Sequence, residues 1–277
     1  MLSSYQLVNP NTETHDAPYS LLFRPNTPNT FLAGTSSQIS IFDLNRSGSG
    51  PVTVLRTIPT RRSPATTTTM KGLVTALALS DGLLAAGTNT RQVGLYAGDG
   101  GGEVVGVFWL PEEDPDAGGG VTQLQWSPCG RYLYIAERRC DLVSVYDIRV
   151  TGLRVDSLRG RSAGTNQRVG IDIATGLGGE VVGGSTDGVV RIWEGSDQGG
   201  DYVGSWRAHD DVVSSAVVHP FSPVMATCSG SRKTFGLGCR LGDSSSSEED
   251  EDVPAEGLWD NSLKVWELPT SSQTPGP

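Results

Sequence analysis

The 277-residue sequence has few of the residues that build metal, disulfide or catalytic sites. Its four cysteines form no Cys-x-x-Cys pair, its three histidines stand in unrelated contexts, and no His-Glu-x-x-His motif occurs. Structural zinc sites and many hydrolase active sites depend on such spacings. We therefore expect reduced thiols in an intracellular protein, with no metal or other cofactor and no enzymatic activity.

Long apolar runs and a surplus of basic residues are also missing. No stretch approaches the ~20 apolar residues that span a membrane, and the N-terminus lacks the basic and apolar regions of a signal peptide. Because the formal net charge is -10, the chain cannot coat nucleic acid through its overall charge. A local basic patch can still attract phosphate groups.

Turn-forming residues, by contrast, are abundant. The sequence contains 36 glycines and 16 prolines, and together these exceed average usage. Residues of this kind reverse the chain, so their abundance favours many short strands over a helical bundle. The composition therefore predicts an all-β fold.

An internal repeat recurs about every 50 residues once the polar insert 232–258 is set aside, close to the ~40–45 residues of a WD40 blade. Each copy has an alternating apolar stretch, a cluster of small residues and an aromatic ending. The endings are Ile41-Phe42-Asp43, Gly94-Leu95-Tyr96, Val145-Tyr146-Asp147, Ile192-Trp193-Glu194 and Val265-Trp266-Glu267. These repeats resemble the WD40 class, whose fold is a β-propeller. We predict about five recognisable blades within 17–268, ending near residues 43, 97, 147, 194 and 267.

Two features depart from a regular WD40 ring. Such rings usually need about seven blades, so we expect an incomplete or N-terminally truncated ring, with an irregular small propeller as the alternative. Asp187 is the best match to the turn aspartate of the WD40 structural tetrad, and Ala208-His209 is the one trace of its Gly-His pair. The tetrad is therefore expected to be mostly degraded.

Three segments are not expected to belong to blades. Residues 1–16 form an N-terminal segment, and 269–277 a disordered tail. The insert 232–258 is expected to be acidic and disordered, because its stretch 243–252 has almost no apolar residue to offset the entropy of ordering. Within the insert, Ser245, Ser246 and Ser247 each precede an acid by three positions, the pattern preferred by kinases of the casein kinase 2 type. An unmodified, solvated loop is the alternative.

A narrower resemblance links most of residues 17–268 to the telomerase Cajal body protein family, which includes a fungal splicing-associated relative. The most distinctive match is Thr165-Asn166-Gln167-Arg168, although Gly98 replaces a tryptophan of the family. The other matching segments are Tyr19 to Pro25, Gly94 to Ala97, Gly184 to Gly188, and Ser229 to Arg232 before the acidic insert.

The resemblance implies a non-catalytic scaffold for small nuclear or Cajal body RNA, including telomerase RNA, and for the proteins of its ribonucleoprotein. It also implies a nuclear location, in nuclear bodies, with the cytoplasm as a second compartment. The candidate RNA-binding residues are Asn166, Gln167, Arg168, Arg24 and Arg232, with Arg138-Arg139 as a second basic spot.

Two alternatives remain open from the sequence. Arg168 could pack or pair between neighbouring blades instead of binding RNA. The whole chain could equally be a general WD40 adaptor, which binds protein partners in a nuclear complex through the faces of its propeller. Salt-dependent RNA binding would distinguish the RNA scaffold from the protein adaptor.

The composition of the acidic insert yields a first prediction. Deleting 243–252 should leave the thermal unfolding midpoint nearly unchanged, because this stretch has almost no apolar surface to bury. Circular dichroism of the deletion variant and the intact chain provides the measurement. A large fall in the midpoint would show that the segment packs against the blades.

Overall fold

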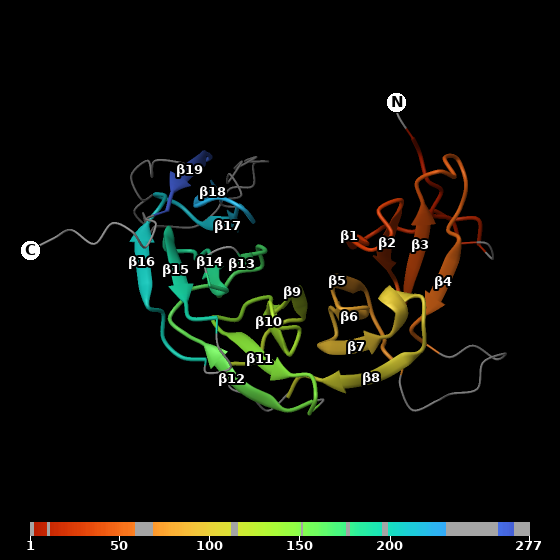
Figure 1. The fold of residues 1–277 in the computed structure, drawn as a ribbon, viewed down its shortest axis with the longest axis horizontal. Coiled ribbons are helices and arrows are strands. Elements are labelled where there is room, and N and C mark those ends of the chain that lie inside the picture. Colours follow the sequence, from red (N-terminus) through yellow and green to blue (C-terminus); the bar gives the residue numbers. More distant parts are fainter. Residues whose placement is uncertain are drawn as a thin grey trace, which may run out of the picture.

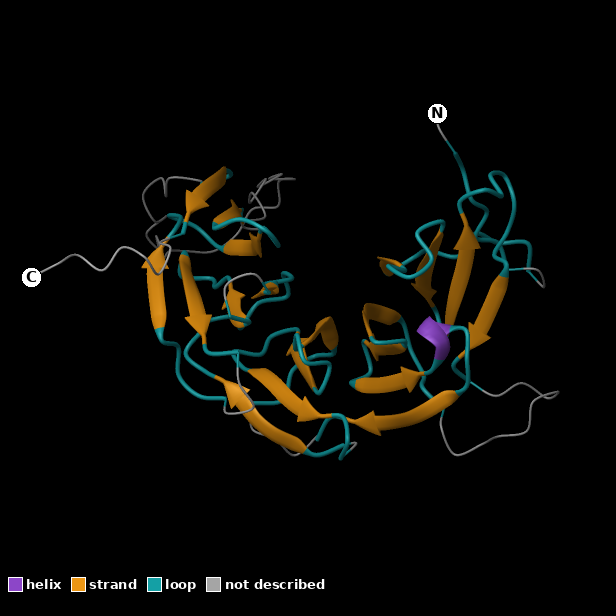
Figure 2. Cartoon of the chain, in the orientation of Figure 1, coloured by secondary structure: helices purple, strands orange, loops and turns teal. Residues whose placement is uncertain are grey.

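The computed structural model describes residues 3–9, 12–58, 69–111, 116–150, 152–175, 178–195, 199–230 and 260–268. They form nineteen strands in five antiparallel sheets, here called blades 1 to 5 in chain order. The helical content of these residues is one 3-10 turn, η1 (Gly98–Gly100), drawn in purple in Figure 2. The all-β prediction and the number of blades are thus confirmed. No helix among the described residues is long and apolar enough to cross a membrane.

Blades 1 to 4 have four strands each, whereas the described residues of blade 5 form three. Blade 1 contains β1 (Ser20–Phe23), β2 (Thr30–Thr35), β3 (Gln38–Asp43) and β4 (Thr53–Arg56). Blade 2 contains β5 (Val74–Ser80), β6 (Leu83–Thr88), β7 (Gln92–Tyr96) and β8 (Val104–Trp109). Blade 3 contains β9 (Val121–Trp126), β10 (Tyr132–Glu137), β11 (Val143–Asp147) and β12 (Arg154–Leu158). Blade 4 contains β13 (Ile171–Ala174), β14 (Glu180–Gly183), β15 (Val189–Trp193) and β16 (Gly204–Arg207), and blade 5 contains β17 (Val213–Val218), β18 (Val224–Ser229) and β19 (Leu263–Glu267).

The blades follow one another in an open arc, with blades 1 and 5 at its two ends (Figure 1). The first strand of each blade lies toward the inside of the arc, and β4, β8, β12 and β16 lie on the outside. Every sheet pairs consecutive strands in antiparallel register, as in a meander. This is the blade architecture of a β-propeller.

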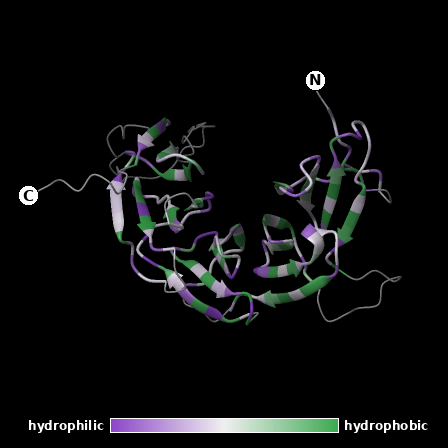
Figure 3. Ribbon diagram, in the orientation of Figure 1, coloured by the Kyte–Doolittle hydropathy of each residue, from purple (hydrophilic) through white to green (hydrophobic). Residues whose placement is uncertain are grey.

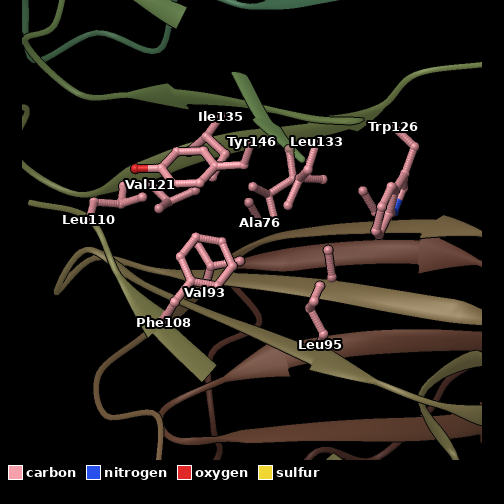
Figure 4. Packing of buried hydrophobic residues seen from close by; sticks show 13 residues of the cluster. Ala76, Val93, Leu95, Phe108, Leu110, Val121, Trp126, Leu133, Ile135 and Tyr146 are labelled. Carbon is pink, nitrogen blue, oxygen red and sulfur yellow. The ribbon is translucent and has the colours of Figure 1, made fainter. Parts of the chain in front are cut away.

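The hydrophobic core lies between neighbouring blades. Figure 4 shows one junction, where Val93 and Phe108 of blade 2 face Val121, Ile135 and Tyr146 of blade 3. The rings of Phe108 and Tyr146 are 5.1 Å apart. Because a single sheet cannot bury both of its faces, each blade needs its neighbour to remove this apolar surface from water.

Small residues in or directly after the second strand of a blade let the next blade approach closely. A Cβ atom on Gly34 would collide with Val74, one on Gly87 with Val121, and one on Gly184 with the backbone of Val213. In each case the colliding residue begins the first strand of the following blade, which we call its inner strand. The small-residue clusters seen in the sequence thus mark the blade junctions.

Side-chain hydrogen bonds link each inner strand to the next. Ser20 Oγ donates to Val74 O (2.7 Å), Thr75 Oγ1 to Val121 O (2.5 Å) and Gln123 Nε2 to Ile171 O (2.7 Å). At the last junction the direction reverses, because Val218 N donates to Asp172 Oδ2 (2.8 Å). Burial raises the pKa of Asp172, although the amides of Val218 and Ile173 oppose that shift by donating hydrogen bonds to it.

The two ends of the arc present apolar side chains to solvent. Leu21 and Phe23 of blade 1 are 65% and 64% exposed, and Leu263 and Val265 of blade 5 are 65% and 66% exposed. Part of blade 1 is covered by the N-terminal segment, where Tyr5 packs edge-on against Phe31 and Phe42. Figure 3 shows hydrophobic residues on the strands of both end blades.

Blade 5 contains a buried chain of hydrogen bonds that joins four side chains. Trp266 Nε1 donates to Thr227 Oγ1 (2.9 Å), which lies 2.7 Å from His209 Nε2. His209 Nδ1 donates to Asp260 Oδ2 (2.9 Å). Hydrogen bonds from Ser262 and the Asp210 amide, together with His209, hold the pKa of Asp260 well below its usual range.

These four residues form an intact Trp–Thr–His–Asp tetrad, which corrects the expectation of a mostly degraded one for this blade. Asp260 was missed because it follows the insert, far along the chain from His209. In blade 4 the corresponding Trp193 donates instead to a backbone acceptor, Arg159 O (2.8 Å). The predicted turn aspartate, Asp187, pairs with Arg191 (2.7 Å).

The tetrad generates a stability prediction. Thr227→Val keeps the side-chain shape but leaves Trp266 Nε1 and His209 Nε2 without the Thr227 hydroxyl, so it should cost about 2–4 kcal/mol of unfolding free energy. Thr35→Val is the matched control, because Thr35 Oγ1 is buried and has no hydrogen-bond partner among the described residues. Chemical denaturation should show a loss for the first variant and little change for the second. Equal effects would contradict the role given to the tetrad.

Candidate nucleic-acid interface

The alternation of strand direction divides the loops between two faces of the arc. The loop before the first strand of a blade and the loop between its second and third strands lie at the same end of the sheet. We call this end the leading face. Loops that follow an inner strand lie at the opposite end, the trailing face. Asn166, Gln167 and Arg168 precede β13 and lie on the leading face, whereas Arg24 follows β1 and lies on the trailing face. These predicted residues therefore do not form one surface.

Arg24 is a contact between blades 1 and 2. Its Nη2 donates to Gly98 O (3.2 Å) in η1 and lies 3.7 Å from Asp99 Oδ2. The Arg24 side chain is 15% exposed and that of Asp99 13%, so little of this ion pair is open to a ligand. The geometry gives Arg24 a part in holding the two blades together.

Gln167 and Arg168 also reach other blades, from the connection between β12 and β13. Gln167 Nε2 donates to Gly230 O (2.5 Å) at the end of β18 in blade 5. Arg168 Nη2 donates to Thr75 O (3.2 Å) of β5, so its side chain extends from blade 4 to blade 2. Unlike Gln167, Arg168 remains exposed.

The loop between β10 and β11 brings two further arginines to the same place. Arg138 Nη1 donates to Asn166 O (2.7 Å), and Arg139 N donates to Thr165 O (3.2 Å). Arg138, Arg139 and Asn166 are exposed. We call Arg138, Arg139, Asn166 and Arg168 the basic cluster; it joins the predicted second basic spot to the Thr165–Arg168 motif.

The electrostatics of the basic cluster favour an anion. Partial burial lowers the pKa of Arg168, and the positive charge of Arg138 lowers it further. Among the residues that the structure describes, no carboxylate pairs with Arg138, Arg139 or Arg168, and the Asn166 carboxamide makes no hydrogen bond. An anion placed between these guanidinium groups would relieve their mutual repulsion.

The acidic residue next to Arg138 is already neutralised. Glu137 accepts hydrogen bonds from Arg91 Nε (2.6 Å) and Nη2 (3.2 Å), and its side chain is buried. This contact with Glu137 raises the pKa of Arg91. Because Arg91 takes up the charge of Glu137, that carboxylate does not compete for Arg138.

The remaining candidate residues lie outside the described residues. They are Arg232 and the phosphorylation candidates Ser245, Ser246 and Ser247. In the part of the chain that the structure describes, no group of three or more His, Cys, Asp or Glu residues is placed to hold a metal ion. The three described cysteines, Cys129, Cys140 and Cys228, are free thiols.

The sequence of blades and the fold of each sheet define a chain of the WD40 propeller class. A chain in the crystal structure of the mitotic checkpoint complex has the same fold, with a TM-score of 0.57, 14% sequence identity and coverage of 79% of this chain and 62% of that one. No family model matches the sequence.

Within that class, the chain resembles the telomerase Cajal body proteins. Telomerase Cajal body protein 1 of Homo sapiens is 30% identical over 222 residues, which are 78% of this chain and 37% of the human protein. The chain thus spans little more than a third of that relative's length. Guanine nucleotide-binding protein negative regulator 1 of Schizosaccharomyces pombe is 27% identical over 273 residues, which are 95% of this chain and 64% of the yeast protein.

The position of Arg24 generates a second stability prediction. Arg24→Met removes the partner of the largely buried Asp99 carboxylate, so we expect a cost of about 1–3 kcal/mol and a fall of a few degrees in the thermal midpoint. Arg46→Met serves as the control, since Arg46 is an exposed arginine without a side-chain contact among the described residues. An unchanged midpoint for Arg24→Met would show that the contact between blades 1 and 2 does not depend on this pair.

Proposed function

We propose that this chain is a non-catalytic WD40 scaffold that binds small nuclear RNA of the Cajal body type, including telomerase RNA, through the basic cluster. In this role it assists the assembly or localisation of a ribonucleoprotein, in the nucleus and its bodies. One observation carries the proposal: the guanidinium groups of Arg138 and Arg168 lie near one another on one face, Arg139 is exposed in the same loop as Arg138, and none of the three has a carboxylate partner among the described residues.

The chemistry of the basic cluster suits a nucleic acid. Guanidinium groups bind phosphate oxygens with paired, charge-assisted hydrogen bonds, and the exposed carboxamide of Asn166 can both donate to and accept from a base edge. The overall negative charge restricts such binding to a local patch. The relatives named telomerase Cajal body protein 1 support this choice of ligand.

Binding of protein partners is the second candidate function. It is favoured by the apolar side chains exposed at both ends of the arc, Leu21 and Phe23 on blade 1 and Leu263 and Val265 on blade 5. Exposed apolar patches on a soluble protein commonly mark contact surfaces. A scaffold of this kind can bind RNA on the leading face and protein at its ends.

Filter-binding titrations with a small nuclear RNA at several salt concentrations test the proposal. If Arg168 contacts a phosphate, Arg168→Ala should weaken binding across RNA sequences and reduce the slope of log affinity against log salt by about one unit. Arg168→Lys keeps the cation but loses the planar fork, so it should rescue a simple phosphate contact better than a base-edge contact.

Arg46→Ala is the matched control, because it removes an exposed arginine from the trailing face. It should leave both the affinity and the salt slope unchanged. If Arg168→Ala binds RNA normally but unfolds at a lower temperature, Arg168 is a structural link between blades. If the unaltered chain fails to bind RNA even at low salt, the protein-adaptor function is favoured instead.

A further inference from the structure

Arg161 is a buried arginine beneath the basic cluster. It lies in the same β12–β13 connection as Asn166 and Arg168, but it is only 3% exposed. Burial lowers its pKa to about 10, so the guanidinium remains charged at neutral pH. Buried charges of this kind are costly unless hydrogen bonds satisfy them.

The Arg161 guanidinium is satisfied by backbone carbonyls from two connections. Its Nε donates to Asp141 O (3.3 Å), and its Nη2 donates to Cys140 O (3.2 Å) and Leu142 O (3.3 Å). Its Nη1 donates to Val169 O (3.5 Å), the residue directly after Arg168. Three consecutive carbonyls of the β10–β11 loop and one of the β12–β13 connection therefore converge on a single side chain.

Other contacts join the same two loops. Asp141 Oδ1 accepts a hydrogen bond from Ala163 N (2.5 Å), and Arg139 N donates to Thr165 O. The first loop carries Arg138 and Arg139, and the second carries Asn166 and Arg168. Arg161 thus lies at the junction of the two segments whose exposed side chains make up the basic cluster.

We infer that Arg161 is a positioning residue for the basic cluster: its buried guanidinium fixes the β10–β11 loop against the β12–β13 connection, and so sets the spacing of the exposed arginines that bind a polyanion. This inference rests on the proposed function. Arg161 itself does not touch the ligand, because it is covered by the loops that it joins. A lysine cannot replace it, since one ammonium group lacks the planar set of donors that four separate carbonyls require.

The test compares Arg161→Lys with the unaltered chain, using the same small nuclear RNA well below the unfolding midpoint of each protein. We expect the affinity to fall about tenfold, the scale of one lost buried hydrogen-bonding arrangement. The salt slope should stay unchanged, because all three exposed arginines are still present. A residue that only stabilised the fold would not alter the affinity of fully folded protein.

Two outcomes would overturn the inference. Unchanged RNA affinity in a folded Arg161→Lys variant would show that the planar guanidinium of Arg161 is not needed to position the cluster. A salt slope reduced by about one unit, as predicted for Arg168→Ala, would show that Arg161 meets a phosphate directly. Arg46→Lys, on the trailing face, is the control and should bind like the unaltered chain.

A second variant and a second measurement separate this inference from the proposed function. Asp141→Asn weakens the same loop junction without removing a buried cation, and because it also removes a negative charge near the cluster, its effect is read by hydrogen exchange rather than by affinity. Amide hydrogen exchange without RNA should be faster in both variants at 138–142 and 162–170 than in the unaltered chain. If the unaltered chain binds no RNA, the proposed function fails, and the exchange data alone decide the positioning role: unchanged exchange overturns it.

Discussion

The structure depends on how one inner strand is held against the next. Adjacent blades do not share a ladder of backbone hydrogen bonds, so the polar links between inner strands depend on individual side chains. The side chains that make these links differ: Ser20, Thr75, Gln123 and Asp172. What is constant is the geometry. Small residues such as Gly87 admit the following strand, and apolar packing between the sheets supplies most of the stabilisation.

The basic cluster is a product of these junctions. Arg168 in blade 4 donates to the carbonyl of Thr75 in blade 2, and the hydroxyl of Thr75 in turn links blade 2 to blade 3. Arg138 of blade 3 donates to the carbonyl of Asn166 in blade 4. Three successive blades thus determine where the guanidinium groups lie. A change in the curvature of the arc would separate them, even if every blade remained folded.

The sequence predicted the blades better than it predicted the site. Aromatic endings such as Trp193 and Trp266 repeat with the blade, so the period located the sheets without knowledge of their contacts. The tetrad was missed because the insert separates Asp260 from His209, and only folding brings the two together. Arg24 and Arg168 both flank inner strands, but one follows its strand and the other precedes it, which places them on opposite faces. Arg138 and Asn166 are joined by a blade junction that local patterns do not reveal.

An acidic protein can still offer an anion site if its carboxylates are taken up locally. Arg91 neutralises Glu137 beside the basic cluster, with Nε and Nη2 on the two carboxylate oxygens. Beneath the surface, the hydrogen bonds of the Arg161 guanidinium go to neutral carbonyls, and the nearby Asp141 carboxylate acts on its charge. Because protein surrounds this charge, it is screened less than an exposed one. Arg161 therefore holds the two loops in place, whereas the exposed arginines of the basic cluster, which have no carboxylate partner among the described residues, supply the positive charge of the leading face.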